Sequence, residues 1–113
     1  MSDHIKIRPA GGTWTVRAAG AVLGETENAL ELIEGEYPAV IYFPRDDISM
    51  AFFDQSETQS TCPHKGAATY YNLEAKSGTF SNAAWSYETP TDDVAQIKGY
   101  LAFYTNIVAV EQL

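Results

Sequence analysis

The sequence predicts a mainly β domain with two short helices. Apolar and polar residues alternate over several short stretches, as they do in half-buried strands. Aromatic residues make up 12% of the chain and include seven tyrosines, a composition that favours strands. Glycine and proline recur between these stretches, where turns are expected. A length of 113 residues corresponds to one domain, which we expect to span residues 1–113.

The N-terminal strands are predicted by alternation. Residues 5–8 and 14–17 each alternate apolar with polar side chains, and a tight turn at Gly20-Ala21 then makes a hairpin with residues 22–24. The run 40–43 is of strand type and stops at Pro44.

A first helix is predicted between these strands. Thr26 is a suitable capping residue, and Gly35 is a suitable end. Ala29, Leu30 and Ile33 would lie on one face of this helix.

The second half of the chain continues the pattern. Residues 48–52 alternate and are expected to form a strand, after which a polar loop leads to Cys62. Further strand signals come from residues 69–73, 79–80, 83–87, 100–104 and 107–110, with a turn at 76–78. The second helix would open at Thr91, with Asp92 and Asp93 at its positive end, and would end at Gly99.

Charge and cysteine content exclude several classes of protein. The net charge of −8 argues against nucleic acid and against an anionic membrane surface as partners. A single cysteine excludes an internal disulfide and a zinc site built from cysteines alone. Asp46-Asp47 lacks further ligands at a recognisable spacing, so we expect no metal and no cofactor. The first residues lack the pattern of a signal peptide, and a cytoplasmic location is expected.

The segment from Ser60 to Tyr71 concentrates the candidate catalytic residues. It holds Cys62, His64 and Lys65, and that lysine is the sole formal charge between Glu57 and Glu74. A thiolate at Cys62 would be stabilised by a neighbouring cation, and His64 has the chemistry of a general base. The alternatives are a cysteine buried for packing and a loop histidine bonded to a carbonyl.

Two cations are candidate ligand-binding residues. Lys65-Gly66 ends like a phosphate loop but lacks the preceding glycines, so Lys65 is either an anchor for an anion or a surface lysine. Arg45 would bind a carboxylate or phosphate as a fork, or would pair locally with Asp46 or Asp47.

Aromatic residues are the remaining candidates for ligand binding. Trp85 and Tyr87 alternate along a predicted strand and should therefore face the same side. Together with Tyr70 or Tyr71 they would form the wall of a cavity, the alternative being core packing.

Four segments carry a resemblance that covers nearly the whole chain. They are Tyr42 to Asp47, Cys62 to Tyr71, Ala84 to Pro90, and Ile97 to Tyr104. In order and spacing they resemble the domain-of-unknown-function 427 family, small bacterial and fungal proteins also labelled nucleotidyltransferase-like. Members of this family often carry tyrosine in place of His64 and tryptophan in place of Tyr71, which argues against His64 as a required base.

The resemblance implies a β-tent fold, in which two antiparallel sheets are pinned together, as in methionine sulfoxide reductase B and the thalidomide-binding domain of cereblon. Several β-tent proteins hold a structural zinc on two Cys-x-x-Cys knuckles, which this chain cannot build. By fold analogy, a small ligand would bind in a groove between the sheets.

Three functions follow as hypotheses. The first is binding of a small molecule in a groove lined by Tyr70, Trp85 and Tyr87, with polar contacts from Arg45 and Lys65. The second is an enzyme of the nucleotidyl-transfer or thiol type, acting through Cys62, Lys65 and Arg45. The third is a homodimer or partner-binding module in which another chain covers an apolar edge strand such as residues 107–110.

Overall fold

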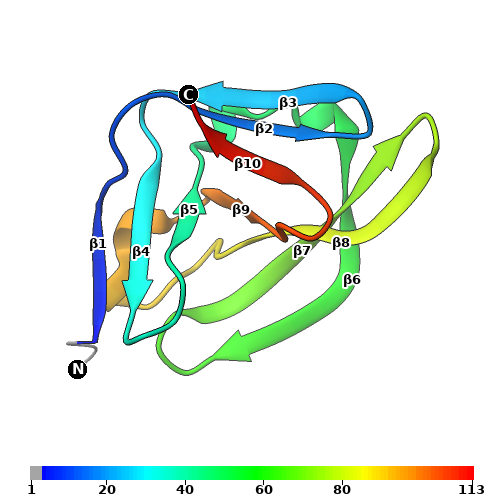
Figure 1. Cartoon of the computed structure of the whole chain (residues 1–113). Helices are drawn as coiled ribbons and strands as arrows, with labels where there is room; N and C mark the ends of the chain where they lie inside the picture. The colour runs from blue at the N-terminus through cyan, green and yellow to red at the C-terminus, as the bar shows by residue number, and fades with distance from the viewer. Residues whose placement is uncertain (1–3) are drawn as a thin grey trace.

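The computed structural model describes residues 4–113, and the first three residues, which bear on the expected absence of a signal peptide, lie outside it. Its strands form three antiparallel sheets, ordered β1-β4-β5, β10-β2-β3 and β6-β7-β8-β9 (Figure 1). The strands are β1 (Ile5–Pro9), β2 (Trp14–Ala18), β3 (Ala21–Thr26), β4 (Leu30–Glu34), β5 (Val40–Tyr42), β6 (Phe53–Cys62), β7 (Gly66–Ala75), β8 (Gly78–Ser86), β9 (Leu101–Phe103) and β10 (Ala109–Gln112). Three short 3₁₀ turns complete the fold: η1 (Arg45–Asp47), η2 (Met50–Phe52) and η3 (Asp92–Ile97).

The mainly β class is confirmed, with three sheets where the tent architecture implied two. The hairpins at Gly20 and at residues 76–78 are confirmed, and the expected second helix is present as η3. In residues 4–113 there is no helix with the length and apolar character needed to cross a membrane.

The predicted helix between Thr26 and Gly35 is wrong, because this segment contains β4. The hydrogen bond of a helix cap is nevertheless present at Thr26, whose hydroxyl accepts from the Asn28 amide at 2.9 Å. The chain then extends and pairs with β1 on one side and with β5 on the other. Pairing with two strands outweighs the weak local preference for a helix.

Two further predicted elements, a strand and a loop, were wrong. Residues 48–52 do not form a strand, because Ile48 makes an isolated bridge to Gly24 and the chain then turns through η2. The polar stretch before Cys62, expected as a loop, is strand β6. This strand lies at the edge of its sheet and is mostly exposed, so its sequence has no apolar alternation to reveal it.

The apolar C-terminal segment packs within the chain itself. Val108 is buried and Ile107 packs against the same core cluster, whereas strand β10 begins only at Ala109. Strand β10 lies at the edge of its sheet, where Ala109 is exposed and Val110 is half-buried, and the dimer stays a prediction.

A backbone pair between Phe43 and Leu101 joins two of the sheets, and we call this pair the seam. The Phe43 amide donates to the Leu101 carbonyl at 2.7 Å, and the Leu101 amide donates back at 2.9 Å. Side chains alternate across this seam, because successive residues of an extended chain face opposite sides. Phe43 and Leu101 belong to one core cluster, whereas Tyr42 and Ala102 belong to a second.

The Arg45 side chain reinforces the seam. Its guanidinium donates to the Gly99 carbonyl at 3.1 Å and to the Tyr71 hydroxyl at 3.2 Å, and it pairs with the Glu88 carboxylate. The same carboxylate accepts hydrogen bonds from Tyr71 at 3.0 Å and from Ser86 at 2.9 Å. The alternative that Arg45 pairs with Asp46 or Asp47 is wrong, since its carboxylate partner comes from beyond β8.

This network also sets the ionisation of Glu88. Partial burial opposes ionisation, but the hydrogen bonds from Ser86 and Tyr71 and the charge of Arg45 outweigh it, so the pKa of Glu88 is lowered from 4.5. Glu88 is therefore ionised at neutral pH and holds the two donors and the guanidinium together.

Replacing Gly24 by alanine should destabilise the fold. A Cβ atom at this position would stand 2.6 Å from the Asp47 carbonyl oxygen, which is backbone and cannot move aside cheaply. We expect Gly24→Ala to lower the free energy of unfolding by about 1–3 kcal/mol, as overpacked positions do. Val22→Ala, on the exposed side of the same strand, should change it by less than about 0.5 kcal/mol. Urea denaturation measures both, and equal stability of the two variants would contradict this close approach.

The Arg45 network predicts a specific acid sensitivity. Since the folded-state pKa of Glu88 is lowered, its ionised form stabilises the fold above about pH 4.5. This contribution disappears as the pH falls through the folded-state pKa. Glu88→Gln should therefore be less stable than the natural protein at neutral pH, and the difference should shrink in acid. Urea midpoints measured from neutral pH down to about pH 3 test this. Glu57→Gln, on exposed β6, is the matched control; a Glu88→Gln deficit that stays constant with pH would refute the prediction.

Candidate functional site

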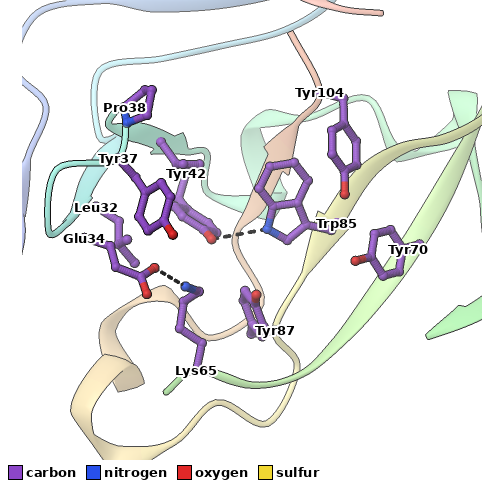
Figure 2. A pocket seen from close by; sticks show the side chains of 11 residues that line it. Leu32, Glu34, Tyr37, Pro38, Tyr42, Lys65, Tyr70, Trp85, Tyr87 and Tyr104 are labelled. Atoms are coloured by element: carbon purple, nitrogen blue, oxygen red, sulfur yellow. Dashed lines mark hydrogen bonds and ion pairs between the residues drawn. The ribbon is translucent and has the colours of Figure 1, made fainter. Parts of the chain in front are cut away.

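A pocket of about 270 Å³ lies over the second core cluster, where the β1-β4-β5 sheet faces β7 and β8 (Figure 2). Aromatic side chains dominate its wall, and one acidic and one basic side chain complete it. The lining residues are Leu32, Glu34, Tyr37, Pro38, Val40, Tyr42, Lys65, Tyr70, Trp85, Tyr87 and Tyr104.

Trp85 occupies the middle of the aromatic wall (Figure 2). Its indole N–H donates to the Tyr42 hydroxyl at 3.2 Å, and the two rings meet edge to face with centroids 6.4 Å apart. On its other side the indole packs against Tyr104, with ring centroids 4.6 Å apart. These contacts fix the orientation of the indole, which is only partly buried.

The charged part of the pocket is an ion pair between Lys65 and Glu34 (Figure 2). The Lys65 side chain is only 12% exposed and that of Glu34 20%. The hydrogen bond from Lys65 is the main reason that the pKa of Glu34 is lowered from 4.5, although burial opposes the shift. His4 stands at the second carboxylate oxygen, 3.6 Å away.

Lys65 is positioned by the turn between β6 and β7. The Lys65 amide closes this turn on the Cys62 carbonyl at 3.2 Å, and the Thr91 amide donates to the Lys65 carbonyl at 3.1 Å. Gly66 follows with a φ of +108°, and a Cβ atom there would stand 3.1 Å from the Thr89 carbonyl oxygen. Glycine is thus required by the turn and by the close approach of residues 89–91, with no phosphate loop involved.

Three phenol groups of the pocket, those of Tyr42, Tyr87 and Tyr104, remain neutral over the physiological range. Burial raises the pKa of Tyr42 to about 12 and is the main cause of the raised pKa of Tyr87. Burial, together with a hydrogen bond to Tyr70, raises the pKa of Tyr104 to about 12. These hydroxyls can therefore donate hydrogen bonds to a ligand, and the charge of the pocket stays that of the Lys65–Glu34 pair.

Four of the five predicted ligand-binding residues line this pocket together. Trp85 and Tyr87 face the same side, as their alternation predicted, and Tyr70 and Lys65 join them. The fifth, Arg45, is not part of the lining and is engaged in the network with Glu88. Tyr71 belongs to that network as well, so Tyr70 is the member of the Tyr70-Tyr71 pair that reaches the pocket. Ligand binding by any of these residues stays a prediction.

The two candidate catalytic residues lie beside the pocket without lining it. Cys62 is half-buried and packs against the second core cluster. The exposed His64 ring meets His4 edge to face, with centroids 4.7 Å apart, while its carbonyl accepts a hydrogen bond from Thr91 at 2.8 Å. Catalysis by Cys62 and His64 stays a prediction.

Several pocket residues escaped the sequence prediction. Glu34 was missed because it lies in the segment expected to be a helix, whereas in strand β4 it shares one face with Leu30 and Leu32. Tyr42 belongs to the apolar run 40–43, which predicts only a strand. It directly precedes Phe43 of the seam, and its side chain lines the pocket. Tyr104 follows β9 directly, and in the sequence it is only the last residue of the predicted strand 100–104.

A second, more open groove adjoins the pocket. It has a volume of about 590 Å³ and is also bordered by Tyr37, Pro38, Val40, Trp85 and Tyr104. The remaining lining is mainly apolar and includes Trp14, Ile41, Phe103 and Val110. Trp85 and Tyr104 therefore stand between the two hollows.

Metal-binding side chains do not gather in the part of the chain that the structure describes. No group of three or more histidine, cysteine or acidic side chains within residues 4–113 is arranged to hold an ion. In the acidic pair Asp46-Asp47, the Asp47 carboxylate accepts a hydrogen bond from the Thr26 hydroxyl at 2.7 Å.

Comparison with known proteins places the chain in a family. A search of curated proteins found no similar sequence. A family model described as "Domain of unknown function (DUF427)" matches residues 6–112. The match runs from β1 to β10 and includes every residue that lines the pocket. The chain therefore belongs to the DUF427 family.

Proposed function

We propose that this protein binds a small organic molecule in the pocket around Trp85. The observation that carries the proposal is the convergence of six aromatic side chains with one half-buried Lys65–Glu34 pair on a single cavity. Ligand sites combine apolar and aromatic walls with a few placed polar groups in this way.

The construction of the wall supports a ligand site over simple packing. Trp85 is held in orientation by Tyr42 and Tyr104 but is left partly exposed. Tyr37, which also lines the pocket, is 74% exposed, so its ring is accessible to a bound molecule. A volume of about 270 Å³ is at the low end for ligand sites, so we expect a compact ligand.

The enzyme hypothesis has weaker support. A transfer reaction on an anionic substrate would use Arg45 and Lys65 together, but these residues take part in separate networks with Glu88 and Glu34. A thiol mechanism would start at Cys62, which packs against the core. If Cys62 reacts with an alkylating reagent in the folded protein as fast as a free thiol does, the thiol mechanism gains support.

Binding can be followed through Trp85 itself. The chain has two tryptophans, so a Trp14→Phe protein reports on Trp85 alone. We expect at least one compound of a metabolite library containing cations, anions, zwitterions and neutral rings to change this emission saturably. Lys65→Ala or Tyr70→Phe should then weaken binding about tenfold, equivalent to about 1.4 kcal/mol.

Lys76→Ala is the matched control, because that lysine lines a different hollow near β3. It should leave the affinity unchanged, and calorimetry on the chain with both tryptophans should give the same ranking of variants. The proposed function fails if no compound alters Trp85 emission, or if Lys65→Ala and Lys76→Ala affect binding equally.

A further inference from the structure

We propose that the ligand of this pocket is a zwitterion that combines an alkylated ammonium group with a carboxylate. The inference rests on the proposed function and specifies the chemistry of the ligand. It follows from the charges of the lining, from the aromatic rings of the lining and from the charge of the whole chain.

The charged groups of the lining balance one another. Lys65 and Glu34 are the charged side chains that line the pocket, and they are paired. A purely cationic ligand would compete for Glu34 and leave the Lys65 side chain, which is only 12% exposed, without its partner. A purely anionic ligand would do the same to the carboxylate. Separating such a pair is costly, and a ligand that carries both charges replaces each partner as it enters.

The aromatic wall favours the positive end of such a ligand. Ring faces carry negative charge density and attract ammonium groups, with tryptophan the strongest. Trp85, Tyr42, Tyr70, Tyr87 and Tyr104 all come from the walls around one hollow. The raised pKa values of Tyr42, Tyr87 and Tyr104 keep these three hydroxyls neutral at physiological pH, so their rings contribute without adding negative charges that would repel a carboxylate.

The negative end of the ligand has its own partner. The Lys65 ammonium points into the pocket from the β6–β7 turn, beside Tyr87 (Figure 2). A carboxylate placed there would accept a charge-assisted hydrogen bond from Lys65. At longer range, the net charge of −8 attracts cationic groups and repels ligands with several negative charges, such as nucleotides.

Isosteric probes separate the two charges. Trimethylglycine carries both, 3,3-dimethylbutyrate has the same shape without the positive charge, and choline carries the positive charge without the carboxylate. In the Trp14→Phe protein at constant ionic strength, trimethylglycine or its longer relative carnitine should change Trp85 emission saturably. Both single-charge probes should bind at least about fivefold more weakly. The loss for 3,3-dimethylbutyrate is that of the cation–π contacts, and the loss for choline is that of the charge-assisted hydrogen bond from Lys65.

Variants assign each charge to its partner. Lys65→Ala should remove most of the advantage of trimethylglycine over choline, and Glu34→Gln should reduce its advantage over 3,3-dimethylbutyrate. Lys76→Ala should change neither ratio. Circular dichroism of each variant checks that its fold is intact.

The outcomes distinguish this inference from the function on which it rests. If choline or 3,3-dimethylbutyrate binds as tightly as trimethylglycine, or if neither zwitterion binds, the inference is overturned. When a neutral ring compound alone changes Trp85 emission, the pocket still binds a ligand but of a different class. When no compound in the library does so, the proposed function fails as well.

Discussion

The paired backbone of Phe43 and Leu101 is the constraint on which the rest of the molecule depends. It joins the β1-β4-β5 sheet to the sheet that ends in β9, through two hydrogen bonds of 2.7 and 2.9 Å. Arg45 stands two residues beyond Phe43 and donates to the carbonyl of Gly99, two residues before Leu101. The side chain thus continues the antiparallel pairing where the backbone strand has ended.

Side chains on the two faces of the seam belong to two different core clusters, because successive residues of an extended chain face opposite sides. Phe43, Leu101 and Phe103 face the cluster that also receives Val16 and Leu23 from the β10-β2-β3 sheet. Tyr42 and Ala102 face the other way, toward the pocket. The ion pair of Glu34 and Lys65 then links β4 to the β6–β7 turn across the pocket itself. The register of the seam therefore determines which side chains fill the first core cluster and which ones face the aromatic pocket.

Much of the fold was predictable from local patterns, and the pocket only in part. Alternation located Trp85 and Tyr87 on one side of a strand, because that property depends only on neighbours in the sequence. The helix expected after Thr26 failed because a local capping signal competed with pairing to β1 and β5, which no short window of sequence contains. Glu34 was lost with that helix. Arg45 was a reasonable ligand-binding candidate, but its partner Glu88 is distant in sequence and became adjacent only through the seam.

We propose that the seam creates a preformed pocket, centred on Trp85, in which a ligand binds. Proton–nitrogen NMR spectra of the labelled protein, titrated with the tightest-binding compound, test it most directly, because each tryptophan gives its own indole N–H signal. We expect the signals of the Trp85 indole and of the Glu34 and Lys65 amides to shift together, with those of Trp14 and the residues near Lys76 unchanged. Shifts concentrated around Arg45 and Glu88, or near Lys76, with Trp85 unmoved would contradict it.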